Sequence, residues 1–232
     1  MRPFRVKIIS PLKATEADLV RRQRRYGEHA QPGTEVRVVN LDAGPAALDS
    51  AGDVLESASA IYRTGAGTTA SECDAILIDC VFDPAVDELA EATGIPTFGP
   101  TRLTLPLVLL VTPRFSIVAR SERQCELLAA TVARYGYGSH LRSLRALGLG
   151  YEEAKRAELF EAAMCARLRQ AVGEDGAGAV VFGSTTMALT EAMVAAAGGA
   201  PLFMPGMVAL RVLEHLWRDG LWPVTRPGAG PR

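Results

Sequence analysis

Short apolar runs alternate with longer amphipathic stretches along most of this chain of 232 residues. The runs are rich in Val and Ile, which predicts strands buried on both faces of a sheet, and the stretches between them predict helices. We expect strands at Val6–Ile9, Glu35–Val39, Cys73–Ile78, Phe115–Ala119, Leu141–Leu147 and Ala179–Phe182. We expect helices at Glu16–Glu28, Asp53–Tyr62, Glu122–Tyr135, Glu152–Val172 and Val208–Trp217. This alternation predicts an α/β fold with parallel sheets joined by right-handed crossovers.

One passage of the chain occurs twice. Residues 73–80, Cys-Asp-Ala-Ile-Leu-Ile-Asp-Cys, lead through a helix-like stretch into Gly94–Pro100. Residues 178–184, Gly-Ala-Val-Val-Phe-Gly-Ser, lead at nearly the same spacing into Gly199–Pro205. Each copy predicts a buried strand, a turn with a small nucleophilic side chain, a helix, and a second short strand that ends in proline.

The duplication predicts two similar domains. We place the first at residues 1–105 plus 206–232 and the second at residues 106–205, with the last expected helix returning to cover the first domain and a frayed tail at 226–232. In such sheets, ligands bind beyond the carboxyl ends of the strands. Two facing copies would therefore put Cys80 and Ser184 on opposite walls of one cleft, an arrangement that suits proton transfer at a carbon centre.

Composition and charge exclude several classes of function. The net charge of −1 provides no field to attract nucleic acid. The arginines within Arg21–Arg25 are flanked by acidic residues and are expected to form a solvated helix face. No apolar run approaches the ~20 residues of a membrane span, and the chain begins directly with a strand rather than a signal peptide.

The cysteines and histidines add two further expectations. Four cysteines without CxxC pairing predict free thiols and a cytoplasmic location. His29, His140 and His215 are scattered without ligand spacing, so no metal site is expected.

Cys80 lies just after its expected strand and just before a helix that Asp83, as N-cap, and Pro84, as first helical residue, would begin. A helix N-terminus lowers a cysteine pKa, which would make Cys80 a suitable acid and base. The alternative is a small buried residue of the core. In the second copy, the hydroxyls and N–H groups of residues 184–186 would suit a carboxylate or an enolate, or form an ordinary N-cap.

Three motifs carry a resemblance to a known family. These are Asp74–Pro84, Arg114–Val118 and Gly183–Met187. The first of them reads DAILIDCVFDP. With them the chain resembles the aspartate/glutamate/hydantoin racemase superfamily, most closely the hydantoin and allantoin racemase branch. The resemblance implies two flavodoxin-like domains related by a pseudo-twofold axis, an active site in the cleft between them, and no cofactor. It also implies two cysteines, one of which removes an α-proton while the other delivers a proton to the opposite face.

The chain departs from this pattern in three places. Ser184 stands where the second cysteine is expected, Ser10-Pro11-Leu12-Lys13 replaces an Asn-Pro-Asn-Thr stretch, and Ala119-Arg120 replaces a pair of hydroxyl residues. If Lys13 and Arg120 reach the cleft, they suit a more negatively charged substrate than a hydantoin; otherwise they lie on the surface. The resemblance places catalysis at Cys80 and Ser184, and substrate binding at Ser10, Val81, Phe82, Arg120, Thr185 and Thr186.

A serine on the second wall changes the expected chemistry. If a hydroxyl is weaker than a thiol by on the order of five pKa units, forming an alkoxide base costs roughly 7 kcal/mol. Racemisation with two bases should then be crippled in at least one direction. Either the enzyme does one-base chemistry, as single-cysteine decarboxylases of this superfamily do, or Ser184 is an engineered replacement for cysteine.

The prediction is therefore a racemase or epimerase that moves a proton at a carbon next to a carboxylate or carbonyl, with Cys80 as acid and base. Its substrate would be a small carboxylate or a cyclic amide, and a homo-oligomer is the family expectation. A decarboxylase of a small dicarboxylic acid is the first alternative. A non-catalytic binder of small acids is the second.

Overall fold

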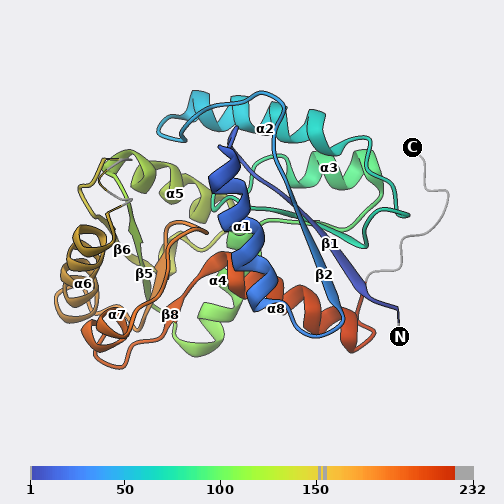
Figure 1. The fold of residues 1–232 in the computed structure, drawn as a ribbon. Helices are drawn as coiled ribbons and strands as arrows, with labels where there is room; N and C mark the ends of the chain where they lie inside the picture. The colour runs from blue at the N-terminus through green and yellow to red at the C-terminus, as the bar shows by residue number, and fades with distance from the viewer. Residues whose placement is uncertain (1, 151–152, 154–155, 223–232) are drawn as a thin grey trace.

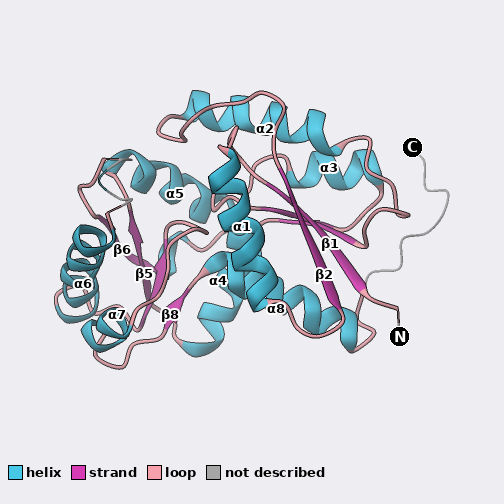
Figure 2. Cartoon of the chain, in the orientation of Figure 1, coloured by secondary structure: helices cyan, strands magenta, loops and turns pink. Residues whose placement is uncertain are grey.

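The computed structural model describes residues 2–150, 153 and 156–222, which form two four-stranded parallel sheets (Figures 1 and 2). The strand orders are β2-β1-β3-β4 and β6-β5-β7-β8, so the same topology occurs twice. The first sheet contains β1 (Phe4–Ile9), β2 (Thr34–Val39), β3 (Ala75–Ile78) and β4 (Thr97–Phe98). The second contains β5 (Phe115–Ala119), β6 (Leu141–Ala146), β7 (Ala179–Phe182) and β8 (Leu202–Phe203). The predicted α/β fold class is confirmed.

The described residues also form eight α-helices and a short 3-10 helix, η1 (Gly138–His140). All except the last helix lie between consecutive strands. They are α1 (Glu16–His29), α2 (Ala51–Gly65), α3 (Val86–Thr93), α4 (Pro100–Val111), α5 (Glu122–Arg134), α6 (Ala157–Gly173), α7 (Glu191–Ala196) and α8 (Pro205–Arg218). Side-chain hydroxyls set four of the helix starts, because Thr15, Ser50, Ser121 and Thr190 each accept a hydrogen bond from a backbone N–H of the first turn. Ser50 therefore begins α2 two residues before the expected position.

Two expected segments fall partly or wholly outside the described residues. The helix expected at Glu152–Val172 begins at Ala157 in the structure, and residues 151–152 and 154–155 are not described. The expected tail at 226–232 lies outside the described residues. No helix in the described ranges combines the length and apolar character that crossing a bilayer requires.

The last helix covers the first sheet, as expected. Leu210 and Leu213 of α8 pack in one buried cluster with residues of β1 and β3 such as Phe4 and Leu77. Trp217 stacks on Phe4 with ring centroids 4.8 Å apart. The first copy of the repeat has a matching helix, α4, which the sequence analysis missed because Pro106 interrupts its apolar run.

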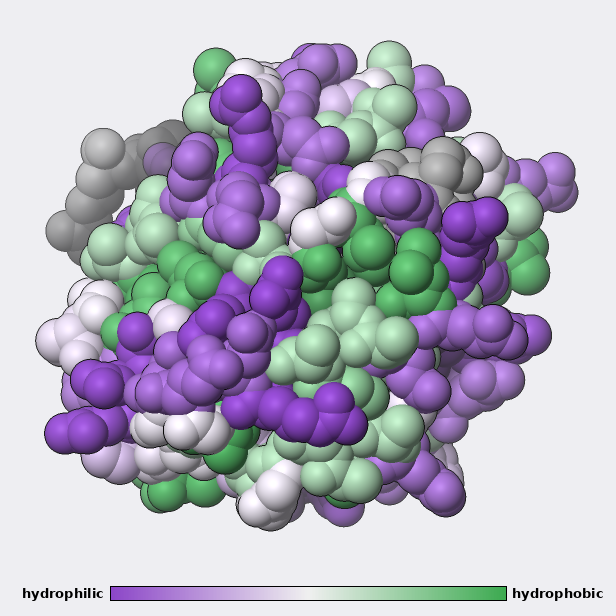
Figure 3. Space-filling view, turned by 90° about the vertical axis from the view of Figure 1, so that its left-hand side faces the viewer, coloured by the Kyte–Doolittle hydropathy of each residue, from purple (hydrophilic) through white to green (hydrophobic). Residues whose placement is uncertain are grey.

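Helix α4 belongs to the first copy of the repeat but packs on the second sheet. Its residues Leu105 and Val108 share a buried cluster with Phe115 and Val181 of the second sheet. Pro106 lies on the exposed side of the helix, so it does not disturb the side that packs on the second sheet. The helix crosses the predicted division between residues 105 and 106, and the domain assignment itself stays a prediction. Seen from the left of Figure 1, the surface is mostly hydrophilic, with apolar residues gathered in a band across its middle (Figure 3).

The turn after β3 differs from the expected helix start. Helix α3 begins at Val86, and its N-cap, Ala85, has a left-handed backbone with no side-chain cap. Asp83 also has a positive φ of 49°, and two such non-glycine residues in one turn store strain of about 1–3 kcal/mol each.

Asp83 caps α4 instead of α3, because its carboxylate accepts from the N–H groups of Thr101 (3.1 Å) and Arg102 (2.7 Å). A side chain at Gly99 would collide with this carboxylate, at 2.1 Å from its Cγ.

This capping carboxyl predicts a pH dependence of stability. Burial raises the pKa of Asp83 from 3.8 to about 7, against the opposing effect of the two N–H groups and the Tyr135 hydroxyl. The folded state therefore binds a proton on the Asp83 carboxyl more tightly than the unfolded state does. This preference stabilises the folded state fully below pH 3.8, and the stabilisation is lost as the pH rises through about 7. Between pH 5 and 8 we expect Asp83 to lower the free energy of unfolding by on the order of 2 kcal/mol.

Urea unfolding of the wild type and Asp83→Asn at pH 5 and 8 measures this effect. The variant should be less stable overall, because an amide leaves one N–H of α4 unpaired, but it should lose this part of the pH dependence. Asp87→Asn is the matched control, since Asp87 is a neighbouring carboxylate whose side chain is 87% exposed. Equal pH profiles for the wild type and Asp83→Asn would contradict the assignment.

Candidate active site

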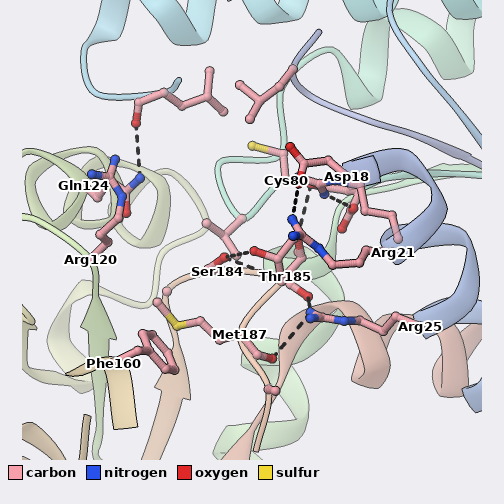
Figure 4. Close-up of a pocket in the computed structure, with 18 of the residues that line it drawn as sticks. Asp18, Arg21, Arg25, Cys80, Arg120, Gln124, Phe160, Ser184, Thr185 and Met187 are labelled. Carbon is pink, nitrogen blue, oxygen red and sulfur yellow. Dashed lines mark hydrogen bonds and ion pairs between the residues drawn. The ribbon is translucent and has the colours of Figure 1, made fainter. Parts of the chain in front are cut away.

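One cavity of about 510 Å³ lies where the strands of the two sheets end. Its walls come from the turns after β1, β3, β5 and β7, together with α1 and the first turn of α6 (Figure 4). A volume in this range suits a small organic molecule. The same edges of the two sheets thus provide a shared site, as the repeated sequence predicts.

The structure brings most of the predicted site residues to this cavity. Its lining includes the predicted residues Cys80, Val81, Phe82, Arg120, Ser184, Thr185 and Thr186. Ser10 is not part of the lining: it is fully buried, and its Oγ donates to the carbonyl of Leu12 at 3.0 Å. Its neighbours Pro11 and Leu12 line the cavity instead, and Lys13 is exposed outside the lining.

Cys80 has different electrostatics from those expected. Because α3 begins only at Val86, the thiol does not sit beside the first N–H groups of a helix. The residue is 4% exposed, and burial raises the pKa of the Cys80 thiol well above its usual range, with Asp83 and Asp79 adding to the rise. The expectation of a lowered pKa was wrong. At neutral pH the resting side chain is a neutral thiol, which is a proton donor.

The opposite wall carries hydroxyl groups. The Oγ of Ser184 lies 3.1 Å from the Oγ1 of Thr186 and accepts from the Thr186 N–H at 3.2 Å. Thr185 is buried, and its hydroxyl donates to the carbonyl of Asp79 at 3.3 Å, so the two repeated turns are in direct contact. Gly183 allows a close approach to the end of β5, since a Cβ there would lie 2.8 Å from the Cβ of Ala119.

Helix α1 contributes a wall that the sequence analysis assigned to solvent. Arg22 forms an ion pair with Asp79, and these side chains are only 12% and 1% exposed. The Tyr26 hydroxyl donates to the same carboxylate at 2.7 Å. Arg25 donates from Nη1 to the carbonyl of Thr185 at 2.8 Å. Arg21, Arg22 and Arg25 all line the cavity. The Arg21 side chain is 62% exposed, so the expectation of a solvated face was wrong only for Arg22 and Arg25.

The spacing of these arginines was the signal available in the sequence. Residues three and four apart share one face of a helix, which places Arg21, Arg22 and Arg25 together and leaves Arg24 elsewhere. Only the tertiary structure shows that this face meets the cavity. Arg120, on the β5 side, is held by an ion pair with Asp49.

An apolar wall faces this cationic one. Leu48, Phe160, Met187 and Met193 line the cavity, together with Glu158 and Glu161 of α6. Among the described residues, no three His, Cys, Asp or Glu side chains gather as a metal site would require. The groups available for chemistry are therefore a thiol, hydroxyls, guanidinium groups and four carboxylates, those of Asp18, Asp79, Glu158 and Glu161.

The two sheets have the same topology, and the ends of their strands face one shared cavity. The protein is therefore an α/β protein of the class that has its site between two duplicated halves. Residues 6–213 match the sequence model of the Asp/Glu/Hydantoin racemase family. The chain therefore belongs to this family of racemases.

Individual relatives agree with this assignment. A hydantoin racemase from Paenarthrobacter aurescens is 29% identical over 188 residues, which cover 79% of each chain. The structure of allantoin racemase from Pseudomonas fluorescens superposes with a TM-score of 0.86 at 20% identity, covering 99% of this chain and 97% of that one. Unliganded arylmalonate decarboxylase superposes with a TM-score of 0.58 at 16% identity, covering 97% and 94%. The two structural likenesses show a shared fold.

Proposed function

We propose that the protein is a cofactor-independent racemase or epimerase of a small cyclic amide or carboxylate, acting at the carbon next to a carbonyl. The observation that carries this proposal is the placement of Cys80 and Ser184 in equivalent turns that line one cavity. The family, and the hydantoin and allantoin racemases among its relatives, support the cyclic amide as substrate.

Cys80 is the acid and base in this proposal. The Cys80 thiol first gives its own proton to water, a step that its raised pKa makes costly. The thiolate then takes the α-proton, and the electron pair of the C–H bond moves into the carbonyl to form an enolate. Return of a proton from the Ser184 hydroxyl to the other face of the α-carbon completes the inversion, and water reprotonates the alkoxide. Burial favours the thiol, whereas the charge of the nearby Arg22 favours the thiolate, so the two oppose each other at this sulfur. The hydroxyls of Ser184 and Thr186 can donate to the enolate oxygen, which is the group that gains charge in the reaction.

A decarboxylase is the second candidate, and the hydroxyl on the opposite wall favours it. Loss of CO₂ leaves the bonding electrons on the α-carbon, and one acid that protonates this carbon completes the reaction. The neutral thiol of Cys80 can do so without a base at Ser184. In a racemase, by contrast, the Ser184 hydroxyl would have to give up its proton and become an alkoxide, at a cost of roughly 7 kcal/mol.

Reaction in D₂O distinguishes the candidates, with a 5-substituted hydantoin and a substituted malonate as probes. We expect deuterium to enter the α-position of the recovered hydantoin, followed by NMR, because a racemase exchanges this proton in substrate that it releases. Label only in the decarboxylated product of the malonate would identify a lyase. If neither probe reacts while both raise the melting temperature, the protein is a binder and the proposal fails.

A further inference from the structure

The three arginines that α1 presents to the cavity differ in their partners. Arg21 forms an ion pair with Asp18, and Arg22 forms one with Asp79. Within the part of the chain that the structure describes, no carboxylate forms an ion pair with Arg25. Its Nη1 donates to two carbonyls, those of Thr185 at 2.8 Å and Met187 at 3.5 Å. Figure 4 shows Arg21 and Arg25 extending from α1 toward the Ser184–Thr185 turn.

A half-buried cation without a counter-ion is unusual. Charged groups that leave water are normally paired, because their desolvation is costly. Burial lowers the pKa of Arg25, and the charges of Arg22 and Arg21 lower it further, while only Asp79 and Tyr26 oppose them. The planar guanidinium has five N–H donors, and the two carbonyls engage only one nitrogen of this fork. This group is therefore suited to a carboxylate brought by a ligand.

We propose that Arg25, assisted by Arg21, binds a carboxylate that the substrate carries in addition to the carbonyl that activates its α-carbon. The inference rests on the proposed function of this same cavity and narrows its substrate to an anionic class. Glu158 and Glu161 line the cavity on the α6 side and repel a carboxylate there. On the α1 side Asp18 and Asp79 also line it, but they form ion pairs with Arg21 and Arg22, so a ligand carboxylate is directed toward Arg25. The apolar side chains of Phe160 and Met193 then accommodate the uncharged part of the molecule.

Equilibrium binding to Cys80→Ala tests this without turnover. The probes are a hydantoin with a carboxymethyl group at C5 and its primary amide, which has the same shape without the charge. Calorimetry should show the acid binding about tenfold or more tightly than the amide, because charge-assisted bonds to Arg are the stronger kind. Adding Arg25→Gln should abolish this preference, and Arg21→Gln should reduce it. Adding Arg24→Gln, a matched exposed arginine of α1 outside the cavity, should leave it intact.

Further measurements separate binding from folding. Arg25→Lys keeps the charge and should retain part of the preference, and thermal unfolding reports whether Arg25→Gln disturbs the turn that it holds. A preference for the acid that survives Arg25→Gln in a folded variant overturns the proposal. Equal binding of acid and amide to the Cys80→Ala protein also overturns it, but leaves the proposed function standing. Failure of both probes to bind overturns the cyclic amide function and the carboxylate site together.

Discussion

Ser184→Cys is expected to raise the rate of racemisation by at least about 100-fold, the lower end of what a positioned acid or base contributes and the largest gain that one substitution should give here. A thiol ionises far more readily than a hydroxyl, so the variant would have an acid and base on each face of the α-carbon. The roughly 7 kcal/mol cost of an alkoxide would then no longer oppose proton return from this wall. Polarimetry from each enantiomer measures the gain, which should be seen in both directions.

Ser184→Ala is the control for this substitution. It removes the hydroxyl without adding a thiol, so any increase in the alanine variant would mean that the serine itself obstructs the reaction. The interpretation would be contradicted if Ser184→Cys folded normally and racemised no faster than the wild type. In that case the two turns do not act on the same carbon atom, and the lyase candidate becomes the better account of the cavity.

Cys80→Ala should abolish turnover, with a loss of about 10²–10⁴-fold in α-proton exchange, the contribution typical of a positioned acid or base. No other thiol lines the cavity in the described part of the chain, so nothing nearby can replace it. Exchange of the α-proton in D₂O, followed by NMR, measures the loss.

Cys125→Ala is the matched control for Cys80→Ala. Cys125 is a free cysteine of α5 that is 5% exposed, compared with 4% for Cys80, and it does not line the cavity. Its replacement removes a similar buried group and should leave the exchange rate unchanged. If Cys80→Ala retained wild-type exchange while remaining folded, Cys80 would be a core residue and the proposed mechanism would be wrong.

Most of the fold could be predicted from local pattern. Phe115–Ala119 and Ala179–Phe182 are strands in the structure as predicted, because a short β-branched run between polar turns has few other stable arrangements. Helix α4 could not be found in this way. Pro106 usually ends a helix, and only the packing of the opposite side of α4 on the second sheet makes it acceptable.

The candidate site also has a part that the sequence predicts and a part that only the structure shows. The repeated motif located Cys80 and Ser184, and the structure places both at one cavity. The partners of these turns came from distant parts of the chain: Arg22 reaches Asp79 across 57 positions, and Arg25 reaches Thr185 across 160. No spacing rule covers such separations, because they depend on how α1 lies between the two halves.

The amino-acid sequence alone thus established the duplicated α/β architecture and the two turns that face each other, since both follow from periodic burial and local backbone preference. The tertiary structure decided the charge state and the surroundings of these turns. Asp83 caps α4 rather than α3, the thiol of Cys80 is buried and neutral, and the arginines of α1 face the cavity. Ionisation depends on burial and on charges that neighbours bring, and these neighbours meet only when the chain is folded.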